Sequence, residues 1–295
     1  MPTLYNQSSS NTRKAFFLIF LFLIFVILLG WALSYIFSEV WILYIAVIFS
    51  ATTALSSYWN SDQIILQKTG AETIEKKDDP ELYRVVENLS ITAGIPMPKI
   101  FVLNEMQPNA FATGRDEKHA VIAVTRGLLQ KLSKRELEGV IAHEMAHIKE
   151  KDILLGSVVV VLVGIVVLIS DIFLRSMMFR SFSDNNNNQH PLLLLFSFIG
   201  IIMAPIAATM IKLAISRKQE FRADAEGSLL TRDPEGLAMA LEKISQDDTP
   251  LRKLDNSTAH LYIAEPYKEN EKTSWYNKLF MTHPPVEDRV RALRR

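Results

Sequence analysis

The stretch IAHEMAH, residues 141–147, contains the pattern H-E-x-x-H, which on an α-helix places two imidazole rings one turn apart. His143 and His147 would then face one metal ion, with Glu144 beside it as a general base. The same pattern also occurs by chance, in which case the two histidines are ordinary core or surface residues. A metal site therefore requires three further features: a helix, a third ligand and a suitable environment.

The residues before the motif predict the required helix. Ser133-Lys134-Arg135-Glu136 fits a capping box, in which the serine hydroxyl and the glutamate carboxylate satisfy backbone groups of the first turn. We therefore expect the helix to begin about ten residues before His143. Leu137 and Val140 give it an apolar face, and the i,i+4 spacing places His143 and His147 on one side.

Hydrophobic runs predict a membrane protein. The chain has 295 residues, of which 49% are hydrophobic. Four runs reach or approach the ~20 residues that cross a bilayer as a helix: 15–38, 40–61, 153–170 and 191–211. The first also resembles a secretory signal, because Arg13 and Lys14 precede it. It is longer than the ~7–15-residue apolar core of a signal and lacks a small-x-small cleavage site, so we predict a retained span. Whether the third and fourth runs cross the bilayer or dip in and return stays open.

Charge, cysteine content and spacing exclude several classes of protein. The formal net charge is zero and no basic stripe is concentrated in the polar segments, which argues against a nucleic-acid partner. The sequence has no cysteine, so a metal ion must be held by histidine and carboxylate. The metzincin class is excluded because it needs glycine and histidine where this chain has Glu150 and Ile153.

The distribution of lysine and arginine predicts the orientation in the membrane. The linker around Glu39 has neither residue and the linker 175–190 has two arginines, whereas residues 61–152 and the C-terminal tail are rich in both. By the positive-inside rule, the N-terminus, the H-E-x-x-H segment and the tail lie in the cytoplasm. The run Asn185–Asn188 then forms a solvated turn on the opposite side.

We expect a membrane α-helical protein with an added α+β part. The four expected segments are an N-terminal transmembrane hairpin (1–62), a cytoplasmic part with the H-E-x-x-H helix (63–152), a second transmembrane hairpin (153–211) and a cytoplasmic part with the third ligand (212–295). Within the second segment, apolar spacing predicts a helix over 79–94. Strands are predicted at 99–103, 109–113 and 120–125, and would form a small antiparallel sheet.

Glu220 and Asp224 are candidates for the remaining metal chemistry. They lie at i and i+4, hence on one helical face, which suits a carboxylate ligand and a carboxylate that accepts from a ligand histidine. By spacing alone, a solvated acidic face paired with Arg217 or Arg222 is equally consistent.

Membrane topology favours the metal-site interpretation. Two predicted spans separate His147 from Glu220, so both residues emerge on the same side. A continuous helix through Lys212 would place Glu220 about 12 Å beyond the fourth span, and His147 lies about 9 Å before the third. The two heights above the membrane agree.

Taken together, these motifs resemble those of the HtpX family of bacterial membrane zinc proteases, relatives of the CAAX prenyl proteases. HEMAHIKEKD leads into a hydrophobic hairpin and is followed by SRKQEFRADAEG, with PNAFATG at 108–114 and THPPVEDRVRAL at 282–293. The resemblance covers nearly the whole chain. It implies a zincin-like protease domain with one zinc ion per chain.

The resemblance also implies roles for individual residues. His143, His147 and Glu220 would be the zinc ligands and Glu144 the catalytic base. The residues expected to support the ligands or lie near the substrate are Asp224, His283, Arg289 and Asn109. The strand 109–113 would pair with an extended substrate through its backbone. His283 would either donate to the developing oxyanion or cap a helix.

The function expected from the resemblance is that of a multi-pass membrane zinc endopeptidase with its active site on the cytoplasmic side. Its partners would be the lipid bilayer and protein or peptide substrates, chiefly misfolded or damaged membrane proteins. One alternative is a CAAX-type prenyl-protein protease, which needs an enclosed lipid chamber that four spans are too few to form. The other alternative is a non-enzymatic membrane scaffold.

Overall fold

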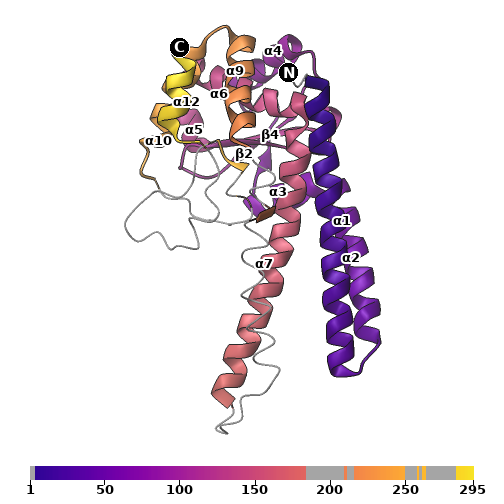
Figure 1. Ribbon diagram of the computed structural model, residues 1–295. Helices are drawn as coiled ribbons and strands as arrows, with labels where there is room; N and C mark the ends of the chain where they lie inside the picture. The colour runs from indigo at the N-terminus through magenta and orange to yellow at the C-terminus, as the bar shows by residue number, and fades with distance from the viewer. Residues whose placement is uncertain (1–3, 184–208, 211–215, 250–257, 259–260, 264–283) are drawn as a thin grey trace.

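A computed structural model of the chain describes residues 4–183, 209–210, 216–249, 258, 261–263 and 284–295. Three long helices run side by side away from a globular part, as Figure 1 shows. They are α1 (Leu4–Phe37), α2 (Trp41–Trp59) and α7 (Asp152–Ser183). The globular part contains a small sheet and the shorter helices, and the start of α1 lies beside it (Figure 1).

The three long helices are apolar enough to cross a membrane. Their candidate spans are Ser10–Phe37, Trp41–Trp59 and Asp152–Ile169, which confirms three of the predicted hydrophobic runs. Large apolar side chains such as Phe17 and Trp31 are exposed on α1, as expected of a surface that faces lipid. The fourth predicted run, 191–211, lies almost entirely outside the described residues.

The helix α7 is longer than its hydrophobic run. It contains 32 residues and spans about 48 Å at 1.5 Å per residue, whereas the predicted run ended near residue 170. The part of the predicted linker from residue 175 to Ser183 is therefore helical. The end of a hydrophobic run depends on the polarity of the side chains. The end of a helix depends on its backbone hydrogen bonds, so the two ends need not coincide. The Asn185–Asn188 run lies outside the described residues.

The globular part confirms the predicted helix at 79–94 and the three strands to within one residue. Its elements are α3 (Ser61–Thr69), β1 (Glu72–Thr73), α4 (Pro80–Ala93), β2 (Lys99–Leu103), β3 (Ala110–Thr113), η1 (Glu117–His119), β4 (Val121–Thr125), α5 (Arg126–Lys131), α6 (Lys134–Glu150), α9 (Arg217–Thr231), α10 (Pro234–Ser245) and α12 (Val286–Leu293). The short strand β1 was not predicted.

The sheet is mixed, so the prediction of an antiparallel sheet is wrong. The strand order is β1-β2-β4-β3, with β2 and β4 parallel and the other two pairs antiparallel. All five residues of β4 are buried, which favours a central position over one at the edge. The strand β3 therefore pairs with β4 on one side only and forms an edge of the sheet.

The helix α6 begins and ends at features that the backbone defines. It begins at Lys134 after the predicted capping box, where the Ser133 amide donates to Glu136 Oε2 at 2.7 Å. It ends at Glu150. The next residue, Lys151, has a φ of 58° and reverses the chain direction, and α7 begins at Asp152. This turn returns Asp152 to the side of α6 that carries His147.

The helix α9 packs closely against α6, and the residue before α9 is not helical. Ser216 is extended, with φ −119° and ψ 126°, so the predicted continuous helix through this point is wrong. Ser216 is the N-cap residue of α9, although its side chain makes no cap hydrogen bond. Farther along α9, Gly227 lies so close to α6 that an added Cβ would be 2.9 Å from the His143 backbone nitrogen.

Replacing Gly227 with valine is expected to lower the free energy of unfolding by about 1–3 kcal/mol, because α9 must move away from α6. Valine and glycine differ little in helix propensity, so packing decides the outcome. Thermal unfolding in detergent measures the loss. Leu229→Val is the matched control, since Leu229 is exposed on the same helix. Equal stability of the two variants would contradict the close packing of α9 on α6.

Candidate metal centre

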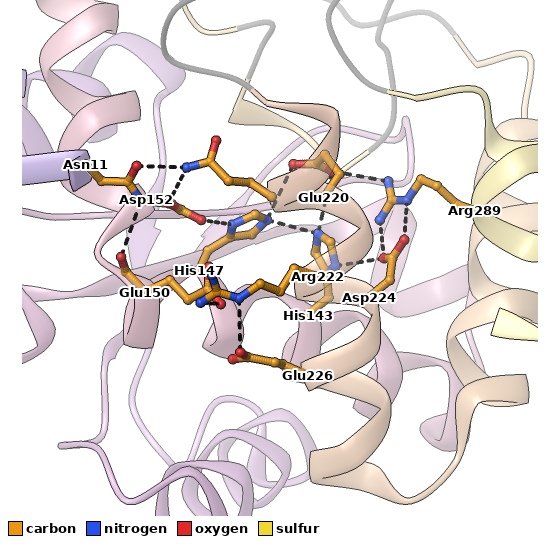
Figure 2. Close-up of polar contacts among 11 residues, drawn as sticks. Asn11, His143, His147, Glu150, Asp152, Glu220, Arg222, Asp224, Glu226 and Arg289 are labelled. Carbon is orange, nitrogen blue, oxygen red and sulfur yellow. Dashed lines mark hydrogen bonds and ion pairs between the residues drawn. The ribbon is translucent and has the colours of Figure 1, made fainter. Parts of the chain in front are cut away.

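Two helices bring three candidate ligands together. His143 and His147 lie on α6 and Glu220 lies on α9, and one ligand atom from each residue lies within 4.8 Å of the others. The two Nε2 atoms are 3.1 Å apart, and His147 Nε2 is 3.6 Å from Glu220 Oε1. Figure 2 shows both rings and the carboxylate pointing toward one another. The predicted cluster of candidate ligands therefore forms.

The cluster fits a zinc ion. Ligand atoms about 2.0–2.1 Å from a tetrahedral zinc ion lie roughly 3.3 Å from one another. The distances of 3.1 and 3.6 Å, and of 3.9 Å from His143 Nε2 to Glu220 Oε2, fall around this value. Among the described residues, four carboxylates approach the two rings, and Arg289 offsets one of these charges. The remaining negative charge suits a divalent cation.

His143 is held by a buried ion pair. Its Nδ1 lies 3.0 Å from Asp224 Oδ1, and the Arg289 guanidinium donates to both oxygens of Asp224 at 2.9 and 2.7 Å. Burial opposes ionisation, but Arg289 and His143 lower the pKa of Asp224 to about 2. Asp224 is therefore a permanent carboxylate beside Nδ1 of His143, and Nε2 of the same ring faces the other candidate ligands.

The alternative interpretation of Glu220 and Asp224 as a solvated acidic face is wrong. Glu220 is 4% exposed and Asp224 is 2% exposed. Arg222 contacts Glu150 and Glu226 rather than these two carboxylates. The cation that pairs with Asp224 is Arg289 of α12, which is 1% exposed and also lies 3.5 Å from Glu220.

His147 has a carboxylate partner of its own, which the sequence did not reveal. Its Nδ1 lies 3.2 Å from Asp152 Oδ2. Burial lowers the pKa of His147, but Asp152 and Glu220 raise it to about 10. The available signal was the aspartate five residues after the second histidine. Asp152 reaches His147 only because of the left-handed turn at Lys151, which the sequence alone does not specify.

Glu144 lies at the wall of the same cleft. Its carboxylate is buried, which raises its pKa, although His143 and His147 lower it. The backbone of Ala112, in the edge strand β3, also lowers this pKa. The cleft has a volume of about 70 Å³. Its walls come from β3, α6, the start of α7, α9 and residues 261–263.

The other predicted site residues have different placements. Asn109 is buried at the start of β3, and its Oδ1 accepts from the Ala110 amide at 3.1 Å. The Ala110 carbonyl, on the open edge of β3, accepts from the Ile263 amide at 3.0 Å. Part of the predicted substrate strand is thus paired with the chain itself. His283 lies outside the described residues.

The fold and the centre define a membrane metallopeptidase with an H-E-x-x-H helix and a glutamate as the third metal-binding side chain. Comparison with known proteins agrees with this class. The chain belongs to peptidase family M48, which residues 76–295 match. It is a zinc metallopeptidase of the HtpX type.

Similar relatives cover nearly the whole chain. The HtpX protease homolog of Caldanaerobacter subterraneus subsp. tengcongensis is 42% identical, with 99% of this chain and 97% of the relative aligned. That of Dictyoglomus thermophilum is 44% identical, with 99% and 94% aligned. The crystal structure of S. mikatae Ste24p is similar in fold, with a TM-score of 0.50 and 19% identity over 98% of this chain and 67% of that chain.

Replacing Arg289 with methionine is expected to lower the free energy of unfolding by about 3–5 kcal/mol, because Asp224 loses its buried cation. The double variant Asp224→Asn/Arg289→Met should regain part of this stability, since no carboxylate is then buried at that position. Denaturant unfolding measures both effects. Arg294→Met is the control, because Arg294 pairs with Glu235 and Glu242 at the exposed end of α12. A loss as large in the control would contradict this explanation.

Proposed function

We propose that His143, His147 and Glu220 hold one zinc ion and that Glu144 is the general base for hydrolysis of a peptide bond. The observation that carries this proposal is the convergence of both Nε2 atoms with the Glu220 carboxylate. When bound, the zinc ion would polarise the scissile carbonyl and make a water molecule more acidic.

Glu144 is suited to move the proton. Its burial raises its pKa and so favours proton uptake from the attacking water. Ala112 of β3 lines the same cleft as this carboxylate. Glu144 would then deliver the proton to the leaving amine. Asp224 and Asp152 accept from the two rings and keep each Nε2 directed into the centre.

We further propose that the substrates are unfolded segments of membrane proteins, as in quality control of misfolded or damaged proteins. Ile153 and Gly156, in the first turns of the candidate span α7, line the cleft. A chain that emerges from the bilayer would therefore reach the centre directly. A cleft of about 70 Å³ favours an extended chain over a folded one. Such a chain would pair with β3 by exchanging with Ile263 at the Ala110 carbonyl.

Glu144→Gln is expected to retain one zinc ion per chain and to lose cleavage of an unfolded reporter, because the amide cannot accept the proton. Glu220→Ala is expected to lose zinc and activity together. Metal analysis of detergent-purified protein and a cleavage assay measure these outcomes, and a strong chelator should abolish wild-type cleavage until zinc is restored. Wild-type activity in Glu144→Gln would refute the assigned base.

We also propose that the centre faces the cytoplasm. The support is the positive-inside distribution of charge, together with the turn at Glu39 between α1 and α2, far from the globular part in Figure 1. Lys76 and Lys77, in contrast, are exposed on the globular part, after both N-terminal candidate spans.

The absence of cysteine allows a direct test of this orientation. In right-side-out membrane vesicles, a membrane-impermeant maleimide should label Glu39→Cys and should leave Lys77→Cys unlabelled until detergent is added. Both positions are exposed, so reactivity in detergent should be similar and serves as the control. Immediate labelling of Lys77→Cys, with protection of Glu39→Cys, would reverse the proposed orientation.

A further inference from the structure

The first membrane helix, α1, has a buried polar side chain near its N-terminal end. Ala15, Leu18 and Phe22 form a buried stripe on α1 that packs against α7, and Asn11 continues this stripe one turn before Ala15. Asn11 is 2% exposed. A buried amide at this position requires hydrogen-bond partners, and it finds them at the start of α7.

Asn11 and Gln219 together hold one oxygen of Asp152. The Asn11 Nδ2 donates to Asp152 Oδ1, and Gln219 Nε2 of α9 donates to the same oxygen at 2.7 Å. Gln219 Nε2 also donates to Asn11 Oδ1 at 3.0 Å. Because a carboxylate only accepts, both amides must present their NH₂ groups to it, and the orientation of each amide is defined.

The other oxygen of Asp152 faces the metal centre. Asp152 Oδ2 lies 3.2 Å from His147 Nδ1, so one carboxylate joins the amide pair to the imidazole (Figure 2). Two donors on Oδ1 prevent rotation of the carboxylate and so keep Oδ2 directed at the ring. The orientation of His147 therefore depends on α1, a helix 136 positions earlier in the chain, counted from Asn11 to His147 (147 − 11).

We propose that Asn11 is a positioning residue of the zinc centre, through which the first membrane helix orients His147 by way of Gln219 and Asp152. The inference rests on the proposed role of His147 as a zinc ligand. His143 is oriented separately, by Asp224 and Arg289 of α9 and α12. Loss of Asn11 should therefore loosen one ligand and leave the other in place.

The experiment compares full-length wild type with Asn11→Ala, Gln219→Ala and Asp152→Asn in detergent. Loss of a carboxylate that supports a ligand typically weakens metal binding by about 10–100-fold, so Asp152→Asn should release zinc to a chelating dye faster by about this factor. Asn11→Ala and Gln219→Ala should accelerate release less, in the same direction. All three should change the visible spectrum of the Co²⁺-substituted protein and lower kcat more than they change KM.

Asn60→Ala is the matched control, because Asn60 is exposed at the end of α2 and its side chain makes no helix-cap hydrogen bond. A lower melting temperature of Asn11→Ala with wild-type zinc release and Co²⁺ spectrum would overturn the proposal, since Asn11 would then be a packing residue. If Asn11→Ala does not fold, the same measurements on Gln219→Ala test the proposal, and wild-type zinc release and Co²⁺ spectrum in that variant would overturn it. The double variant Gln219→Ala/Asp152→Asn should release zinc no faster than Asp152→Asn, and additive effects would also overturn the proposal.

The wild-type measurements separate this inference from the proposed function. If wild type binds no zinc, or if Glu144→Gln cleaves normally, the proposed function fails. If wild type binds zinc and cleaves while the three network variants match Asn60→Ala, the positioning role alone fails.

Discussion

The close approach of two carboxylates to the two imidazole Nδ1 atoms is the constraint on which the metal centre depends. His143 pairs with Asp224, and His147 pairs with Asp152. A histidine ring can present either nitrogen, and a carboxylate at Nδ1 fixes both the tautomer and the ring so that Nε2 is available. Two elements around α6 meet this requirement. The helix α9 places Asp224 beside one ring, and the turn at Lys151 places Asp152 beside the other.

Burial of these carboxylates requires compensation from distant parts of the chain. Arg289 on the last helix is almost fully buried and contacts both Asp224 and Glu220. Uncompensated charges in such an environment cost several kcal/mol, so α12 contributes to the centre although it carries no candidate ligand. The close approach of α9 to α6 at Gly227 serves the same purpose, since a larger separation would remove Glu220 from the histidines.

Local patterns in the sequence predicted local structure well. The capping box at Ser133, the strand at 99–103 and the shared face of His143 and His147 each depend on neighbouring residues, and the structure has all three. The mixed sheet, the helix break at Ser216 and the pairing of Asp152 with His147 were not predicted. These features depend on which segments meet in space. Strand spacing and hydropathy do not indicate which strand pairs with which, or which side chains come into contact. Glu220 was predicted because two expected spans after His147 would return the chain to the same side of the membrane, and the structure places Glu220 beside both histidines.

The position of Asp152 links the peptidase centre to the membrane part. It is the first residue of α7, and it also contacts His147 and the buried amide of Asn11 on α1. A residue with both roles cannot follow a tilt of α7 or α1 without moving the ring that it supports. The two membrane helices and the H-E-x-x-H helix therefore form one mechanical unit at this point. This arrangement explains why the centre lies at the junction between the long helices and the globular part, rather than deeper in the sheet region.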